Sequence, residues 1–354
     1  MSQKKLRTPE EYAELFEAQQ RIVELKKQNA KLNNQLSKEK ERKQDLYDAV
    51  YEASSIAFSE LEIKPVKPPK KDTRKLQEEV AVVWCADWQM GKVTPTYDSG
   101  ICANRIDTYG QKILEIVDIQ RKSKKINKAH IWILGDIIEG TDIFPGQAWL
   151  VDSGLYKQIL DTGLKTLSNL IRTLLTTFDT IHIAGVIGNH GRLGRIGQHS
   201  YDDNGDRMLY KVCEMLFADE KRVTWDIPEG NRGDRAWYTV DRIGNYSSLL
   251  VHGDQFRGQL GIPWYGVRKK VLGWKSMASQ GQMPEFKDVS FGHWHQIYSQ
   301  DMNGITVRCS GSPESSNPYA AENLAAMGKA SQRMMFVEPK KGIVTAEYQG
   351  IWLE

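Results

Sequence analysis

The stretch His130-Ile-Trp-Ile-Leu-Gly-Asp-Ile-Ile-Glu139 places two carboxylates directly after a short apolar run. A run of this length, rich in β-branched and aromatic residues, predicts a buried strand. Polar side chains on the loops that follow such strands lie where layered α/β proteins build their active sites. The stretch therefore predicts an α/β fold with Asp136 and Glu139 at the functional edge of a sheet.

Four further segments have the same form, a potential metal ligand directly after a short apolar run: Asp87-Trp-Gln89, Gly188-Asn189-His190, Val251-His252-Gly253 and Gly292-His293-Trp-His295. Carboxylate, amide and imidazole groups all bind divalent cations. Any one of these segments alone would be weak evidence, because Asn and Gly also favour ordinary turns. Five in sequence predict one metal site that is divided among several loops.

This order of motifs resembles the calcineurin-like metallophosphoesterase superfamily over roughly residues 79–315. Within it, the chain is most similar to DNA nucleases of the SbcD type and to the exonuclease subunit of archaeal family D polymerases, whose second motif the stretch 135–147 resembles. Two positions depart from the family pattern. Gln89 stands where the family usually has histidine, and Gly191 stands where Gly-Asn-His is usually followed by aspartate. The Asp-x-Gln form is similar to phage-encoded members, which implies a phage origin.

The resemblance implies a centre with two divalent metal ions, most readily Mn²⁺, with Mg²⁺ or another transition metal as alternatives. Each ion would have four ligands, and Asp136 would bridge the two: Asp87, Gln89, Asp136 and His295 for the first, and Asp136, Asn189, His252 and His293 for the second. A neutral amide at Gln89 favours an oxygen-preferring ion, although Gln89 could instead bind only a metal-bound water.

His190 is the predicted catalytic residue, facing the scissile phosphate to stabilise the transition state or protonate the leaving oxygen. Glu139 is expected to orient a ligand or the loop rather than to bind metal. Because Gly191 removes the usual carboxylate, the sequence names no group that orients His190. His130 and His182 lie inside apolar runs and are expected to be structural.

Cations and aromatic residues follow two of the motifs. The candidate substrate-binding residues are Arg192, Arg195, Arg257, Lys269 and Lys270, and the last two lie among Trp264, Tyr265 and Trp274. Such a mixture suits a nucleic-acid backbone and unstacked bases. The alternative is that 267–274 is an amphipathic helix with solvated charges and core tryptophans.

Apolar residues in the N-terminal region recur with a seven-residue period. With Leu15 at position a, the a and d positions are mostly apolar through Ala53, and Asn29 at an a position favours a parallel pair in register. We expect a coiled coil over residues 1–60 that forms a homodimer, or alternatively a single helix docked on its own domain or on another protein. A basic, proline-rich linker is expected at 61–78, before a phosphoesterase domain at 79–354.

The whole chain sets the remaining expectations. Its 354 residues allow one large domain with an appendage. Strands and helices alternate and are then followed by consecutive strands, which predicts a sandwich of mixed sheets flanked by helices and preceded by the coiled-coil helix. The four cysteines have no metal or disulfide spacing, and Cys85 and Cys309 are expected to be buried hydrophobes in a reducing cytoplasm, that of the host if the gene is a phage's. No apolar stretch is long enough to span a membrane.

The expected function is metal-dependent hydrolysis of DNA phosphodiester bonds. DNA is the expected partner, and the resemblance to the SbcD type also implies a partner ATPase. Two alternatives stay open: a phosphatase or phosphodiesterase for nucleotides or other small esters, and an inactive interaction protein whose coiled coil is its working part. The net charge of +3 is too small to decide for nucleic acid.

Overall fold

The computed structural model describes residues 20–35, 37–38, 65–194, 199–230, 235–257, 262–317, 321–322 and 327–354. The chain divides into two units, Met1–Glu60 and Leu61–Glu354, and each is described by itself. In the first unit, residues 20–35 and 37–38 are helical and exposed. Ile22, Leu25 and Leu32, which hold a and d positions of the predicted coiled coil, are more than half exposed. The rest of the heptads lies outside the described residues, and pairing of the helix stays a prediction.

The first sheet of the second unit has the strand order β11-β10-β1-β2-β3-β4 in the described chain. Its strands are β1 (Glu78–Cys85), β2 (Lys125–Ile133), β3 (Thr180–Gly185), β4 (Val223–Asp226), β10 (Ser331–Glu338) and β11 (Ile343–Trp352). The four strands from β1 to β4 are parallel, whereas β10 runs antiparallel to both β1 and β11. The carboxyl ends of the parallel strands therefore share one edge of this sheet.

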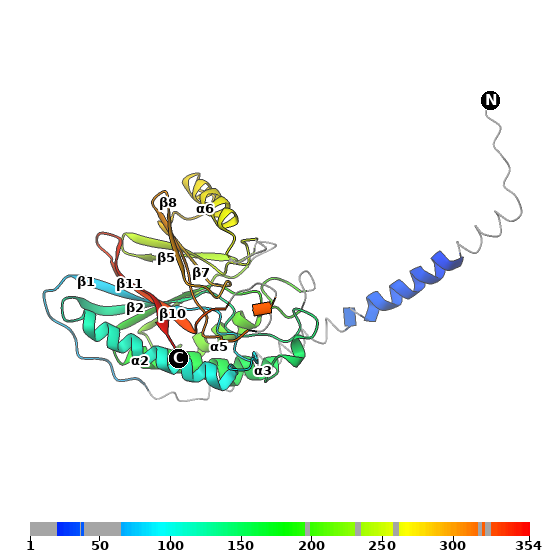
Figure 1. The fold of residues 1–354 in the computed structure, drawn as a ribbon, viewed down its shortest axis with the longest axis horizontal. Coiled ribbons are helices and arrows are strands. Elements are labelled where there is room, and N and C mark those ends of the chain that lie inside the picture. Colours follow the sequence, from blue (N-terminus) through cyan, green and yellow to red (C-terminus); the bar gives the residue numbers. More distant parts are fainter. Residues whose placement is uncertain are drawn as a thin grey trace, which may run out of the picture. The chain divides into compact units, whose positions relative to one another are not determined.

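The second sheet has the order β5-β6-β7-β9-β8 and is also mixed. Its strands are β5 (Tyr238–Ile243), β6 (Tyr246–Val251), β7 (Asp288–Phe291), β8 (Tyr298–Met302) and β9 (Ile305–Cys309). The two sheets lie face to face (Figure 1). Between them is an apolar core that includes Trp84, Trp132 and Leu250.

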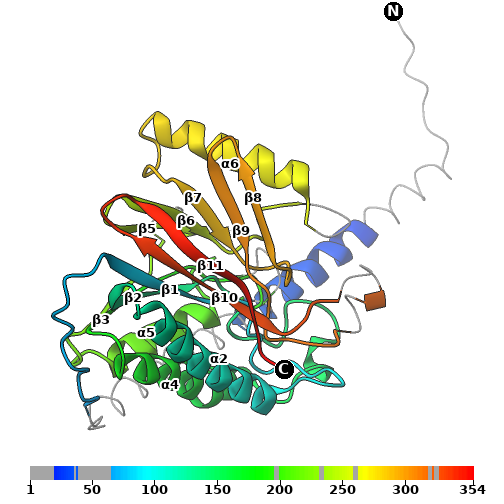
Figure 2. The same cartoon turned by 60° about the vertical axis from the view of Figure 1, so that its left-hand side comes forward.

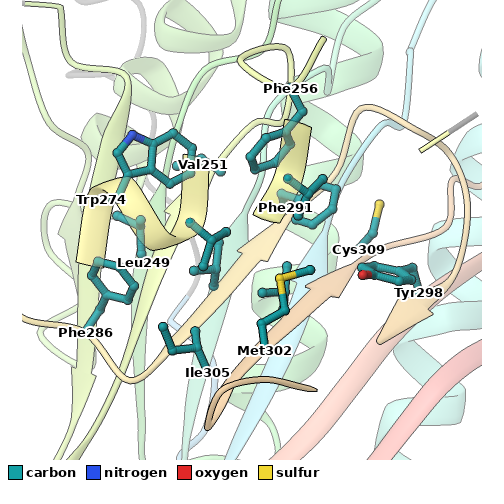
Figure 3. Close-up of a cluster of buried hydrophobic side chains, with 14 of the residues drawn as sticks. Leu249, Val251, Phe256, Trp274, Phe286, Phe291, Tyr298, Met302, Ile305 and Cys309 are labelled. Carbon is teal, nitrogen blue, oxygen red and sulfur yellow. The ribbon is translucent and has the colours of Figure 1, made fainter. Parts of the chain in front are cut away.

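Helices cover the outer faces of both sheets (Figure 2). The described helical segments are α2 (Ser99–Gln120), η1 (Gln147–Trp149), α3 (Leu155–Lys157), η2 (Gln158–Gly163), α4 (Leu164–Leu175), α5 (Gly205–Leu216) and α6 (Trp264–Ser279). α2, α4 and α5 pack on one another along the first sheet. α6 covers the second sheet, and its Val267 and Trp274 belong to one buried cluster with Leu249 and Phe291. Figure 3 shows Trp274, Leu249 and Phe291 of this cluster. The predicted sandwich of mixed sheets flanked by helices is confirmed.

Several element boundaries differ from the prediction for local reasons. α2 begins at Ser99 rather than near residue 104, because the Asp98 carboxylate accepts a hydrogen bond from the Ile101 amide and caps the helix. The helix expected from Val151 begins only at Leu155, and its second turn, η2, is a π-helix. All four cysteines are buried, as expected for Cys85 and Cys309. No helix in the described part of the chain is long and apolar enough to cross a bilayer.

Candidate metal centre

The predicted ligands come together where strand ends of the two sheets meet. The loops that follow β1 and β2 are joined by backbone hydrogen bonds, from Asp87 N to Gly135 O at 3.0 Å and from Gln89 N to Asp136 O at 2.9 Å. The Asp87 carboxylate also accepts the backbone amide of His293, with distances of 2.8 and 2.9 Å to its two oxygens. Because His293 follows β7, this contact ties the first sheet to the second.

The four residues assigned to the second metal converge on one nitrogen atom, His252 Nε2. It lies 3.1 Å from Asp136 Oδ2, 2.9 Å from Asn189 Oδ1 and 3.2 Å from His293 Nδ1. One imidazole nitrogen carries at most one proton, so it cannot donate to all three neighbours. One ligand atom each from Asp136, His252 and His293 lies within 4.8 Å of the other two. Such a convergence of electron-pair donors is what a bound cation requires.

The other ring nitrogen of His252 contacts the backbone. His252 Nδ1 lies 2.7 Å from the Leu134 carbonyl oxygen, to which it donates its proton. A neutral imidazole with its proton on Nδ1 presents a lone pair at Nε2, which is the form that binds a metal. Asp136 Oδ2 is buried and forms no hydrogen bond with any described residue, so it is also available. These residues fit a divalent ion.

Some of the residues assigned to the first metal are engaged in other contacts. His295 Nε2 lies 3.7 Å from Asp87 Oδ1 and 3.2 Å from the Gln89 amide nitrogen. The Gln89 amide oxygen instead accepts a hydrogen bond from Lys92 Nζ at 2.7 Å. Coordination by Gln89 therefore requires its amide to turn away from Lys92. Its role as a ligand stays a prediction.

Glu314 contacts both His295 and the neighbouring Lys92. Its carboxylate lies 2.9 Å from His295 Nδ1 and 2.8 Å from Lys92 Nζ. Burial raises the pKa of Glu314, but the hydrogen bond from His295 and the charge of Lys92 outweigh it and lower the pKa to about 2. An ionised Glu314 orients the His295 ring so that Nε2 faces the other ligands.

His190 lies beside the Asp136 carboxylate, and its ring contacts Glu139. The His190 amide donates to Asp136 Oδ1 at 2.7 Å, and its ring Nε2 lies 4.0 Å from Asp136 Oδ2. Ring Nδ1 lies 3.0 Å from Glu139 Oε2. Gln147 donates to Glu139 Oε1 at 3.0 Å and to the Glu139 carbonyl at 2.8 Å, which fixes the carboxylate. Glu139 thus occupies the orienting position for which the sequence named no residue.

Burial and charge shift the pKa values of these acids and bases. Burial lowers the pKa of His190, but the neighbouring Glu139 and Asp136 carboxylates outweigh burial and raise the pKa to about 9. Burial, together with the charge of Asp136, raises the pKa of Asp87 to about 6, although His295 and His252 oppose the shift. A protonated His190 next to ionised carboxylates suits a general acid.

Several of the ligands have an unusual backbone conformation. Among the described residues, the non-glycine residues with positive φ include Asp87, Gln89, Asp136, His293 and His295, with φ between 44° and 69°. This left-handed region is disfavoured for residues with a Cβ. Such strain concentrates at functional sites, where the surrounding structure holds it in place. The shared conformation therefore supports a common function for these five residues.

Asp206 supports the loops after β2 and β3. Its buried carboxylate accepts backbone hydrogen bonds from Asp136 and Gly188, at 2.8 and 2.9 Å, and from Ile137 and Ile138, at 3.0 and 3.1 Å. Gly188 has to lack a side chain, because a Cβ there would lie 2.1 Å from Asp136 Oδ1. These contacts hold the backbone of the loop that carries Asp136.

The predicted substrate-binding residues differ in their surroundings. Arg192 forms an ion pair with Asp254 at 3.4 Å. Arg257, Lys269 and Lys270 are exposed, whereas Arg195 lies outside the described residues. Trp274 is a core residue, as the amphipathic-helix alternative expects, but the same helix α6 exposes Trp264 and Tyr265.

Sequence reasoning missed Glu314, Asp206 and Lys92. Glu314 follows strand β9 after a short polar turn, so the pattern of an acid soon after an apolar run could have found it. Asp206 lies in the first turn of α5, where an acidic residue is ordinary. No local signal distinguishes Lys92 from a solvated lysine.

Neither a protein-family profile nor a curated protein matches the sequence of this chain. Solved structures with a similar fold include an archaeal phosphodiesterase, at 11% identity and a TM-score of 0.34 over 76% of this chain and 98% of that one. A predicted phosphoesterase from Streptococcus pneumoniae has 12% identity, coverage of 73% and 83%, and a TM-score of 0.30. Vacuolar Protein Sorting 29 from Cryptosporidium parvum has 13% identity, coverage of 77% and 99%, and a TM-score of 0.35. At these scores the functional conclusion rests on the geometry of the centre itself.

Proposed function

We propose that this protein is a metal-dependent phosphoesterase of the calcineurin-like type that hydrolyses phosphodiester bonds of DNA. The observation that carries the proposal is the convergence of Asp136, Asn189 and His293 on His252 Nε2. His190 lies next to this group, and Glu139 orients its ring. Phosphoester hydrolysis of this type uses a set of metal ligands and an oriented histidine beside them.

The ligands assigned above would hold two divalent ions, with Mn²⁺ the expected metal. When bound, the ions would neutralise the phosphate oxygens and lower the pKa of a bound water to provide the nucleophile. Asp136 would lie between them, so that its negative charge reduces their mutual repulsion. Asp206 and the backbone of the β2 loop would keep that carboxylate in place during turnover.

His190 would act on the leaving group. Glu139 and Asp136 raise the pKa of the ring, which favours the protonated form that can donate a proton from Nε2 to the departing alkoxide. Glu139 stabilises this charged form and holds Nδ1. The same charge would also stabilise the phosphate oxygens in the transition state.

Exposed aromatic side chains near His190 favour DNA as the substrate. The Phe144 ring lies 6.5 Å from the His190 ring, and Trp149 is 90% exposed on η1. η1 is anchored to the centre through Gln147, which donates to Glu139. Exposed aromatic faces provide stacking surfaces for unpaired bases. The stretch 135–147, which suggested a nuclease from sequence, thus extends from the bridging carboxylate to the start of this aromatic segment.

The test is a panel of phosphoesters incubated with the full-length protein and Mn²⁺. It contains a small phosphomonoester, a small phosphodiester, and end-labelled single- and double-stranded DNA and RNA. We expect EDTA-sensitive cleavage of DNA, and a loss of about 10²–10⁴-fold in His190→Ala, which should keep its bound metal.

Other outcomes would contradict parts of the proposal. Hydrolysis of small esters with every oligonucleotide left intact would replace DNA with a small-molecule substrate. If the protein hydrolyses none of the esters in a metal-dependent way, it is an interaction protein that acts through its N-terminal helix. Loss of metal from His190→Ala would make His190 a ligand and would overturn its catalytic role.

A further inference from the structure

A second group of potential metal ligands lies away from the candidate metal centre. It consists of His130 on β2, His182 on β3 and Asp241 on β5, and one ligand atom of each lies within 4.8 Å of the other two. His130 precedes Ile133, the last residue of β2, by three residues, so the group lies about 10 Å back along β2 from the strand end that leads to Asp136. The two groups share no residue.

Strand register and alternation bring these side chains together. His130 pairs directly with His182 in the parallel ladder of β2 and β3. Side chains two residues apart lie on the same face of a strand, so His130 shares a face with Trp132 of the core between the sheets. Asp241 approaches from the opposite sheet, where it shares a face of β5 with Ile243 of the same core. The group therefore spans the two sheets at the rim of their shared core.

The two carboxylate oxygens of Asp241 have different neighbours. Oδ2 lies 2.6 Å from His130 Nδ1 and accepts the Trp132 indole N–H at 2.5 Å. Oδ1 lies 3.7 Å from His182 Nε2. That distance is too long for a hydrogen bond. It is close to the roughly 3.3–3.6 Å that separates two ligand atoms on one tetrahedral ion with bonds of about 2.0–2.2 Å.

His182 is prepared to act as a ligand. Its Nδ1 lies 2.8 Å from Thr224 Oγ1, which can accept the Nδ1 proton and leave a lone pair on Nε2 toward Asp241. The His182 side chain is 30% exposed, whereas the Asp241 side chain is 2% exposed. An ion between them would therefore be reachable from solvent on the histidine side and held by a fixed carboxylate on the other.

The charges around the group also favour a cation. Burial keeps the pKa of His182 below its usual value, although Asp241 and Asp226 oppose this shift. Burial raises the pKa of Asp241, but His130 and the Trp132 N–H outweigh it and lower the pKa. Asp226, whose Oδ2 accepts the Thr239 hydroxyl, adds a second negative charge near His182.

We propose that His130, His182 and Asp241 form an additional site for a divalent transition-metal ion that joins the two sheets and takes no part in hydrolysis. Two imidazoles and one carboxylate suit Zn²⁺ and leave a fourth position for water. Binding through His130 Nδ1 requires the proton at that nitrogen to leave or to move to Nε2. The hydrogen bond between His130 and Asp241 is then exchanged for two metal bonds, and the Trp132 N–H still holds the carboxylate.

The test counts Zn²⁺ on the full-length protein by equilibrium dialysis and elemental analysis, after chelation and reconstitution. The variants are Asp241→Asn and His182→Gln, and His199→Gln is the matched control because His199 lies outside both groups. We expect the wild type and the control to bind about one more equivalent of Zn²⁺ than the two cluster variants. Zn²⁺ should also raise the unfolding temperature of the wild type more than that of His182→Gln.

An equal Zn²⁺ content in all four proteins would overturn the proposal. The group would then be a set of hydrogen bonds between the sheets that binds no metal. Asp241 is buried, so Asp241→Asn could fail to fold. In that case the comparison rests on His182→Gln, because the His182 side chain is 30% exposed. Loss of phosphodiesterase activity in a folded His182→Gln would overturn the separation from the catalytic centre. Because the readout is metal content, it does not depend on which ester the protein hydrolyses.

Discussion

Replacement of Glu139 by glutamine tests whether this residue positions His190 rather than binding metal. Glu139 is buried, with Oε2 at 3.0 Å from His190 Nδ1 and Oε1 at 3.0 Å from the Gln147 amide nitrogen. A glutamine that keeps its oxygen toward Gln147 presents its NH₂ group to Nδ1, so that a donor meets a donor. The volume at position 139 is almost unchanged, so the fold should remain.

The expected loss follows from the bond that is removed. A hydrogen bond to a charged group contributes about 1.5–3 kcal/mol, which corresponds to roughly a 10–150-fold lower kcat. The pH profile should change as well. Glu139 raises the pKa of His190, so its removal lowers that pKa. As a general acid, His190 works when protonated, and the rate falls as pH rises through its pKa. The alkaline limb of kcat against pH should therefore move to lower pH in Glu139→Gln.

The assay is kcat against pH on a phosphodiester, with bound metal measured on the same samples. Glu115→Gln, an exposed site on α2, is the matched control and should match the wild type. Unchanged kcat together with an unchanged alkaline limb would refute the orienting role. A loss of metal that accounts for the whole decrease would instead make Glu139 a ligand.

Three further predictions concern the bridging ligand, the unusual ligand and the N-terminal helix. Asp136→Asn should lose both metals and all turnover, and two tightly bound ions in this variant would refute the bridge. Gln89→His should strengthen the first site and shift its preference toward Zn²⁺, provided that the ring displaces Lys92. An unchanged metal profile would mean that Gln89 does not coordinate. A chain that begins at residue 76 should be monomeric by light scattering, cleave short substrates normally and bind long DNA less well. If it is still a dimer, the second unit pairs by itself and the helix is a docking element.

The sequence predicted those parts of the site that depend on local signals. Asp87, Asp136 and His252 each follow an apolar run, and each lies at the end of a buried strand. Because β1 and β2 are parallel and end at one edge, Asp87 and Asp136 are brought close together. His252 follows β6 of the other sheet, so its approach depends on how the two sheets pack. The sandwich class could be predicted for the same reason, since alternating helices and strands followed by strands leave few arrangements.

Contacts between distant segments could not be predicted in this way. Glu314 reaches Lys92 and His295 only because the chain returns after β9, and no sequence spacing encodes that return. The order of strands in the first sheet, where the late β10 pairs with β1, is likewise set by packing of whole elements. His130 and His182 were expected to be structural because each lies in an apolar run. Only the ladder pairing and Asp241 from the other sheet bring them into one group.

The left-handed backbone at Asp87 lowers the stability of the protein at a predicted ligand. Its φ is 54°, a conformation that costs about 1–3 kcal/mol for a residue with a Cβ, whereas glycine adopts it freely. Asp87→Gly should therefore unfold at a higher temperature than Asp87→Ala, although both lack the carboxylate. Selection for heat resistance alone would favour glycine at such positions and would remove the carboxylate of the predicted ligand. Under the proposed function, stability and activity therefore oppose each other at Asp87.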